Sequence, residues 1–129
     1  FRKENALILI EVLKNISSIR IPFPPNDIKH AWYKFYIYII PSAIKNDWSR
    51  DRIIKEINNK GYPCYSGGCG EIYLEKGIIN AGYLQKSPLP IASNLAETSL
   101  MFCIHPTISK EQMYKYSELI KAILIKASI

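Results

Sequence analysis

The segment Gly61-Tyr-Pro-Cys-Tyr-Ser-Gly-Gly-Cys-Gly-Glu-Ile-Tyr-Leu-Glu-Lys76 is the most informative part of this chain. Its three closely spaced glycines, Gly67, Gly68 and Gly70, allow backbone conformations that other residues rarely adopt, and they let a ligand approach the main chain. A glycine-rich loop that also carries serine and tyrosine hydroxyls predicts a binding site. A tight turn whose tyrosines pack on the core explains the same residues about equally well.

The segments around this loop predict a helix and two strands. Ser49 and Asp51 are the residue types of a helix start and Gly61 is a suitable helix stop, so we expect a helix between them. The segment His30–Ile40 is dense in aromatic and β-branched residues, which predicts a long strand with two apolar faces. Leu100–Ile104 predicts a buried strand.

Helices are also expected at both ends of the sequence. Arg2–Ile16 predicts an amphipathic helix. Its expected buried stripe is Leu7, Ile8, Val12 and Ile16. Ser109 and Gln112 have the spacing of a capping box, which predicts a final helix that ends near Ala127. The expected buried stripe of that helix is Met113, Tyr116, Ile120, Ile123 and Leu124.

The middle of the chain predicts short elements, namely an extended piece at Pro63–Tyr65, a helical turn near Glu71–Lys76, a loop at Ile78–Pro90 and a helix at Ile91–Glu97. The complete order is helix, strand, helix, short strand, helix, strand, helix. This order predicts an α/β fold, a two-layer sandwich in which a small mixed β-sheet has helices packed on one face.

The composition fits a single globular domain, residues 1–129. The chain has 129 residues, of which 48% are hydrophobic and 22% are charged, and this is enough for a core of its own. No apolar run reaches the roughly 18 residues of a membrane span, so we expect no membrane partner. The net charge of +6 suits an anionic partner, but the scattered lysines are better explained as solvated residues on helix faces.

The three cysteines are too few and too irregular for a disulfide framework. Cys64 and Cys69 lack the Cys-x-x-Cys spacing of zinc and redox sites, so we expect no metal site. No histidine lies beside them in the sequence, which favours inert thiols over nucleophiles. Reduced thiols predict a cytoplasmic protein.

Two segments resemble the C-terminal domain of the DegT/DnrJ/EryC1/StrS aminotransferases. The first is Asn59–Lys76, with its Gly-Tyr-Pro-Cys-Tyr-Ser-Gly run, and the second is Leu95–Ile108, with the run Glu-Thr-Ser-Leu-Met-Phe. Arg2–Asn5 resembles the helix that leaves the large domain of these enzymes, and His30–Lys34 resembles the first strand of their small domain. The resemblance implies the C-terminal small domain of a fold-type I aminotransferase, with residues 1–20 as a connecting helix and residues 28–129 as the small domain.

The resemblance also implies a function for the intact enzyme, the pyridoxal-phosphate-dependent transfer of an amino group to a nucleotide-linked keto sugar. The lysine, the acid and the phosphate donors that hold this cofactor lie in the large N-terminal domain of the family. We therefore expect a missing large domain, no catalytic or cofactor-binding residue in this chain, no covalently bound cofactor and no activity of the chain alone. A homodimer and a role in cell-surface polysaccharide, lipopolysaccharide or aminosugar biosynthesis are further implications.

The resemblance assigns the glycine-rich loop to the substrate. It implies that Tyr65, Ser66, Gly67 and Gly68 line the sugar side of the cleft, with Tyr73 nearby. Hydroxyls and bare backbone amides hydrogen-bond sugar hydroxyls and diphosphate oxygens. Tyr73 is explained about equally well as a core residue.

Two other functions explain part of the sequence. The aromatic segment Trp32–Tyr38 would suit a small basic nucleic-acid-binding module with exposed rings as stacking platforms, although its lysines do not cluster. A structural or dimerising remnant would expose the apolar surface that normally faces its partners. Arg50 and Arg52 could pair with a phosphate, but helix-surface ion pairs explain them better.

Overall fold

The computed structural model describes residues 1–83 and 87–129. Their strands form one antiparallel sheet in the order β1-β2-β4-β3. The bounds are β1 (Ile19–Arg20), β2 (Phe35–Ile39), β3 (Cys64–Tyr65) and β4 (Ser99–Phe102). The two central strands lie far apart in the sequence and pair with Phe35 opposite Phe102 and Tyr38 opposite Ser99.

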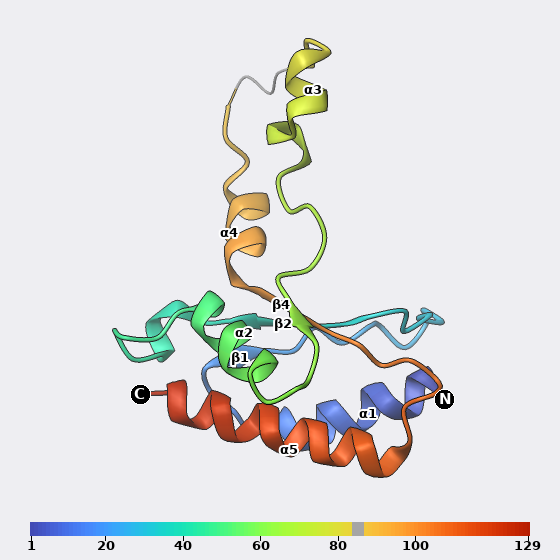
Figure 1. Cartoon of the computed structure of the whole chain (residues 1–129). Helices are drawn as coiled ribbons and strands as arrows, with labels where there is room; N and C mark the ends of the chain where they lie inside the picture. The colour runs from blue at the N-terminus through green and yellow to red at the C-terminus, as the bar shows by residue number, and fades with distance from the viewer. Residues whose placement is uncertain (84–86) are drawn as a thin grey trace.

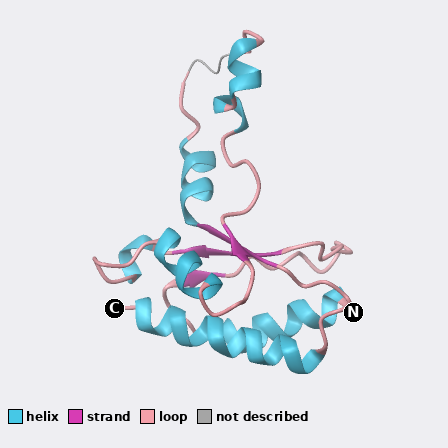
Figure 2. Cartoon of the chain, in the orientation of Figure 1, coloured by secondary structure: helices cyan, strands magenta, loops and turns pink. Residues whose placement is uncertain are grey.

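The long helices cover one face of this sheet. Figure 1 shows α1 (Arg2–Leu13) and α5 (Lys110–Ala127) side by side on that face, and α2 (Arg50–Asn58) packs beside α5. The remaining helices lie in the connections, as Figure 2 shows. They are η1 (Pro41–Ala43), η2 (Ile72–Leu74), α3 (Lys76–Asn80) and α4 (Pro90–Thr98).

Residue alternation along β2 divides the sheet into two faces. Phe35, Ile37 and Ile39 are buried in the core against the helices, whereas Tyr36 and Tyr38 lie on the opposite face and are half-buried. We call this opposite surface the open face. Because side chains alternate along a strand, the pairing register also places Arg20, Ser99, Met101 and Tyr65 on the open face.

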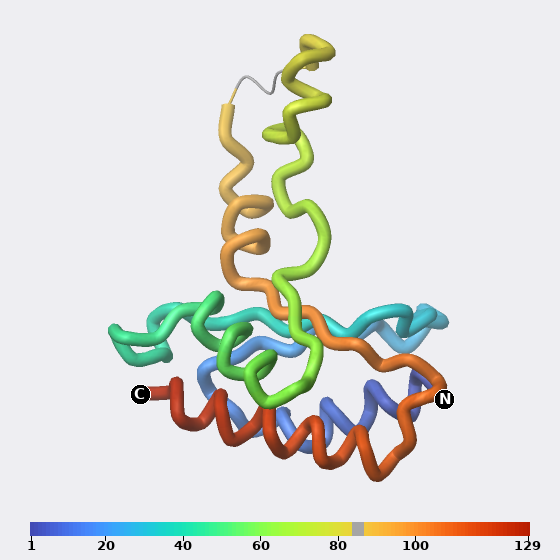
Figure 3. The backbone as a smooth tube through the Cα atoms, in the orientation of Figure 1, coloured from blue at the N-terminus to red at the C-terminus, as the bar shows by residue number. Residues whose placement is uncertain are grey.

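One segment projects from the open face, and we call residues 66–98 the arm. Figures 1 and 3 show its two legs running alongside each other away from the sheet, on the side opposite α1 and α5. The first leg follows β3 and contains η2 and α3, and the second leg contains α4 and leads into β4. The arm therefore begins and ends at neighbouring strands of the sheet.

The two-layer α/β fold with helices on one face is confirmed. Several details differ from the expectations. The sheet is antiparallel rather than mixed, and a two-residue strand, β1, was not expected. The predicted loop at 78–90 contains most of α3 and the start of α4, and residues 84–86 of that loop lie outside the described residues.

Two predicted elements have different limits. The long strand at 30–40 is shorter, because Trp32 has a φ of 48° and the extended ladder begins only at Phe35. The buried stripe of the first helix is shifted, since Leu7 is exposed and Leu9 and Leu13 are fully buried. The stripe of α5 and its capping box are confirmed.

Candidate functional site

The predicted site residues lie where β3 turns into the arm. Cys64 pairs with Phe102 and belongs to the core, so the next residue, Tyr65, points to the open face opposite Met101. The side chain of Tyr65 is 50% exposed. Ser66, Gly67 and Gly68 follow directly in the first leg of the arm, with Ser66 and Gly68 exposed.

Hydrogen bonds from two helices fix the approach to this segment. The Asn58 side chain at the end of α2 donates to the Cys64 carbonyl (2.9 Å) and accepts from the Cys64 backbone N–H (2.8 Å). From α5, the Tyr116 hydroxyl donates to the Pro63 carbonyl (2.6 Å). Burial raises the pKa of Tyr116, so its hydroxyl keeps this proton across the neutral range. Neither contact was expected from the sequence.

Ser99 and Tyr36 hold the loop itself against the sheet. The Ser99 hydroxyl donates to the Ser66 carbonyl at 2.5 Å, which joins the two legs of the arm at their base. Gly67 has a φ of 107°, and a Cβ atom there would come within 2.8 Å of Cε1 of Tyr36. Glycine is therefore required at Gly67 both by the backbone conformation and by the neighbouring ring.

Arg50 reaches from α2 to the second leg of the arm. Its guanidinium donates to the carbonyls of Ala96 (3.0 Å) and Ser99 (3.2 Å), and its side chain is only 19% exposed. The expected helix-surface ion pair is present too, with Asp51. Arg50 thus also satisfies carbonyls at the end of α4, where a helix leaves them without intrahelical partners. Arg52 forms an ion pair with Asp47 (3.0 Å), as expected.

Tyr73 lies farther along the arm, in η2, and is outside the core cluster. Its hydroxyl donates to a Glu71 carboxylate oxygen (2.5 Å) and accepts from the backbone N–H of Leu89 (3.3 Å). The hydrogen bond to Glu71 raises the pKa of Tyr73. Tyr73 therefore connects the two legs of the arm.

The thiols near the site are weakly reactive. Burial raises the pKa of Cys64 to about 12. A hydrogen bond from Sγ of Cys69 to Glu75 (3.0 Å) raises the pKa of Cys69. Both side chains are protonated at neutral pH, and a thiol is a poor nucleophile. The described residues bring together no group of three or more His, Cys, Asp or Glu side chains that could hold a metal ion.

The described lysines lie outside the buried core, which bears on where pyridoxal phosphate could bind. Such a site needs a lysine for a Schiff base, an acid at the pyridine nitrogen and donors around the phosphate. None of the lysines that the structure describes is buried. Several of them form ion pairs on the helix surfaces, such as Lys14 with Glu11 and Lys110 with Glu4.

The aromatic segment at the start of β2 does not present a row of free rings. Trp32 and Phe35 are 7% and 1% exposed, and their rings stack in the core. Only Tyr33, at 73%, is strongly exposed in this segment. This arrangement does not support a stacking platform for nucleic acid, which needs several accessible rings.

Comparisons with solved structures bear on the fold and the family. No protein-family model matches the sequence, and a search of curated proteins also gave no match. An aminotransferase from Psychrobacter cryohalolentis superposes with a TM-score of 0.89 and is 34% identical over 98% of this chain, which covers 34% of that enzyme.

Two more distant structures show the same fold. A DegT/DnrJ/EryC1/StrS aminotransferase from Brucella abortus has a TM-score of 0.72 at 20% identity, with 94% of this chain and 30% of that chain covered. A sugar aminotransferase from Micromonospora echinospora has a TM-score of 0.75 at 13% identity, with 94% and 29% covered. The chain thus spans about a third of the length of the solved structures it matches.

Proposed function

This chain belongs to the DegT/DnrJ/EryC1/StrS aminotransferases, and on that premise we propose that it is the C-terminal small domain of an enzyme that aminates a nucleotide-linked keto sugar. The similarity to the Psychrobacter enzyme carries the proposal, because it combines sequence identity with a shared fold over nearly the whole chain. In the intact enzyme, pyridoxal phosphate supplies the amino-transfer chemistry. We assign the residues that hold it to a large domain outside this chain.

The role of this domain is to form the substrate-side wall of the active site. The hydroxyls of Tyr65 and Ser66 and the backbone amides of Gly67 and Gly68 are suited to hydrogen-bond sugar hydroxyls and diphosphate oxygens. The contacts from Asn58, Tyr116 and Ser99 support this assignment, since they fix the backbone of the loop. A fixed loop loses little conformational freedom when a ligand binds. We also include Tyr73 in the proposed site, because it lies in the same arm as the loop.

The assembly and cellular setting are parts of the same proposal. We expect a homodimer, a cytoplasmic enzyme and a role in cell-surface polysaccharide, lipopolysaccharide or aminosugar biosynthesis. We retain residues 1–20 as a connecting helix and residues 28–129 as the small domain, although α1 contributes Leu9 and Leu13 to the shared core. No helix in the described ranges has the length and apolar character needed to cross a membrane.

Two substitutions in the enzyme that carries this domain test the wall. Tyr65→Phe and Ser66→Ala each remove one hydroxyl and should raise the KM for the nucleotide-linked keto sugar by about 2- to 10-fold, the value of one hydrogen bond. The Kd for pyridoxal phosphate, measured by titration of its absorbance, should stay unchanged. Tyr114→Phe and Ser42→Ala are matched controls, because both side chains are exposed and lie outside the loop.

Unchanged substrate constants in both loop variants would contradict the placement of the wall. An equal loss of cofactor and substrate binding would show instead that the loop is needed for the structure of the whole enzyme. A failure of the unmodified enzyme to aminate any nucleotide-linked keto sugar would overturn the proposed reaction itself.

A further inference from the structure

The buried side chain of Tyr116 reaches from α5 to the segment that leads into the loop at 65–68. Tyr116 is 3% exposed, and its hydroxyl donates to the Pro63 carbonyl at 2.6 Å. Its ring stacks on Tyr62 with the centroids 4.8 Å apart and meets Phe102 edge to face at 5.9 Å. Phenylalanine would serve the packing alone, because a buried hydroxyl is costly unless it is hydrogen-bonded. The bond to Pro63 is therefore the contribution that is specific to tyrosine.

Asn58 of α2 holds the next residue along the chain, Cys64. β3 has only two residues and lies at an edge of the sheet that the described strands form, so the backbone groups on its outer side lack a strand partner there. The Asn58 side chain takes this place, since its amide donates to the Cys64 carbonyl (2.9 Å) and accepts from the Cys64 N–H (2.8 Å). One amide group can do both because it carries a donor and an acceptor.

Tyr116 and Asn58 bind the two ends of the same peptide unit. The carbonyl of Pro63 and the N–H of Cys64 belong to one planar group, and they point in opposite directions because the peptide is trans. Asn58 also binds the Cys64 carbonyl, which belongs to the next planar group. Fixing both planes fixes the two backbone torsions of Cys64 that lie between them. These torsions set the position and direction of Tyr65.

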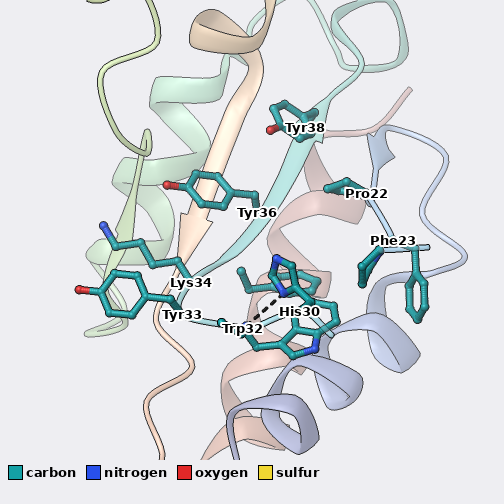
Figure 4. Close-up of a pocket in the computed structure, with 11 residues that line it drawn as sticks. Pro22, Phe23, His30, Trp32, Tyr33, Lys34, Tyr36 and Tyr38 are labelled. Atoms are coloured by element: carbon teal, nitrogen blue, oxygen red, sulfur yellow. Dashed lines mark hydrogen bonds between the residues drawn. The ribbon is translucent and has the colours of Figure 1, made fainter. Parts of the chain in front are cut away.

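The far side of the loop is fixed as well. Ser99 donates to the Ser66 carbonyl. Gly67 lies against Tyr36, whose Cε1 would be 2.8 Å from a Cβ atom at Gly67, and Figure 4 shows the ring of Tyr36 extending from β2. Tyr65 and Ser66 thus lie between two anchored parts of the backbone, and both are exposed. Their hydroxyls can meet a ligand only where this backbone places them.

We propose that Tyr116 is a positioning residue for the substrate, although it is too buried to touch a ligand itself. Its hydroxyl and the Asn58 side chain hold one peptide unit, and that unit determines where Tyr65 and Ser66 meet the nucleotide-linked sugar. This inference rests on the proposed function. It adds a buried residue, 53 positions after Pro63, on which substrate binding depends.

The first test is Tyr116→Phe in the intact holoenzyme, which removes the hydroxyl and keeps the ring. The KM for the nucleotide-linked keto sugar should rise about 3- to 10-fold, because the peptide that carries Tyr65 loses one of its anchors. The kcat should fall by a smaller factor, and the Kd for pyridoxal phosphate should stay unchanged. Tyr114→Phe makes the same change at an exposed position of α5 and should leave all three constants unchanged.

A second comparison separates positioning from a general loss of stability. Ile123→Val removes one methylene group from a buried side chain about two turns further along α5. It weakens the packing of the helix but leaves the hydrogen bond of Tyr116 in place, so the KM should stay unchanged. A KM raised equally by Ile123→Val and Tyr116→Phe would show that Tyr116 only supports the core, and the inference would be wrong.

A double-mutant cycle tests the route from Tyr116 to the ligand. If Tyr116 acts through the two loop hydroxyls, Tyr116→Phe should raise the KM less than about twofold in an enzyme that already carries Tyr65→Phe and Ser66→Ala. An equal rise in both backgrounds would contradict this route. Asn58→Ala releases the same peptide unit from its other end and should also raise the KM. It decides the question alone if circular dichroism shows that Tyr116→Phe does not fold.

The outcomes also distinguish this inference from the proposed function. A raised KM in Tyr65→Phe, with an unchanged KM in both Tyr116→Phe and Asn58→Ala, would keep the loop as the substrate wall and overturn only the positioning role. Unchanged KM values in Tyr65→Phe and Ser66→Ala would overturn both. An unmodified enzyme that aminates no nucleotide-linked keto sugar would likewise remove the reaction on which the positioning role rests.

Discussion

Gly67 combines two constraints at one position of the loop that we propose contacts the substrate. Its φ of 107° is outside the range that residues with a side chain adopt readily, and the Tyr36 ring occupies the space where a Cβ atom would stand. Gly68, its neighbour in the sequence, has no heavy atom within 4 Å of its Cβ position and no positive φ. The two glycines therefore serve different purposes. Of the two, only Gly67 must be glycine because of its backbone conformation and its neighbours within the protein.

We predict that Gly67→Ala lowers the free energy of unfolding by about 1–3 kcal/mol, because the loop must leave its conformation or displace Tyr36. Gly68→Ala should change it by less than about 0.5 kcal/mol, as at an unconstrained surface position. Urea denaturation followed by circular dichroism measures both values. Equal effects of the two substitutions would contradict the steric role of Tyr36.

At the scale of elements, the arm is anchored at its base by polar contacts between segments far apart in the sequence. Arg50 of α2 donates to carbonyls of Ala96 and Ser99, and Ser99 donates to the Ser66 carbonyl. These bonds attach both legs of the arm to the two-layer body. The orientation of the proposed substrate loop relative to the sheet thus depends on α2, which does not itself contain a proposed ligand contact.

We predict that Arg50→Gln loosens the second leg of the arm. The substitution leaves two carbonyls without their donor, at a cost of about 1–3 kcal/mol. Hydrogen exchange of the amides of residues 95–100 should become faster, and in the intact enzyme the KM for the proposed sugar substrate should rise more than kcat falls. Lys55→Gln on the same helix is the control, because it removes an exposed charge that contributes little to stability. Unchanged exchange in Arg50→Gln would show that the arm is held by other contacts.

Local signals predicted several elements correctly. The Ser49 cap and the Ser109–Gln112 capping box depend on residues three positions apart, and both form as expected. The contacts that hold the loop could not be predicted in this way. Ser66 and Ser99 are 33 positions apart, and Arg50 and Ala96 are 46 apart, so only the strand pairing brings them together. No local pattern distinguishes such a serine or arginine from a solvated one.

At the scale of the whole molecule, the two faces of the sheet have opposite characters. The helix-covered face contains a continuous core that includes Leu9, Phe35, Phe102 and Leu124. The open face carries the arm and the loop that follows β3. The alternation along β2 fixes this division, but the composition of Trp32–Tyr38 does not reveal it. The sequence predicted a strand with two apolar faces, and tyrosine is compatible with either a core or a surface position.

We predict that the 129-residue chain alone folds cooperatively but neither binds pyridoxal phosphate as a Schiff base nor transaminates. Its core is of a size that supports independent folding, and no described lysine is buried in a cofactor pocket. Circular dichroism during urea titration tests the first part. Absorbance in the Schiff-base band after addition of pyridoxal phosphate, together with a coupled transaminase assay, tests the second. Either signal from the isolated chain would overturn the assignment of the chemistry to another domain.

The packing of α1 against α5 has a consequence for synthesis of the protein on the ribosome. These helices are the first and last in the described sequence, and they bury Leu9, Leu13, Ile120 and Leu124 in one cluster. The centre of the sheet likewise cannot form before β4 has been synthesised, because β4 begins more than 60 positions after the start of β2. Contacts of such high sequence separation form late. The part of the nascent chain that forms this domain therefore cannot complete its core until α5 has emerged, and a product truncated before α5 would be a substrate for chaperones and proteases rather than a smaller stable domain.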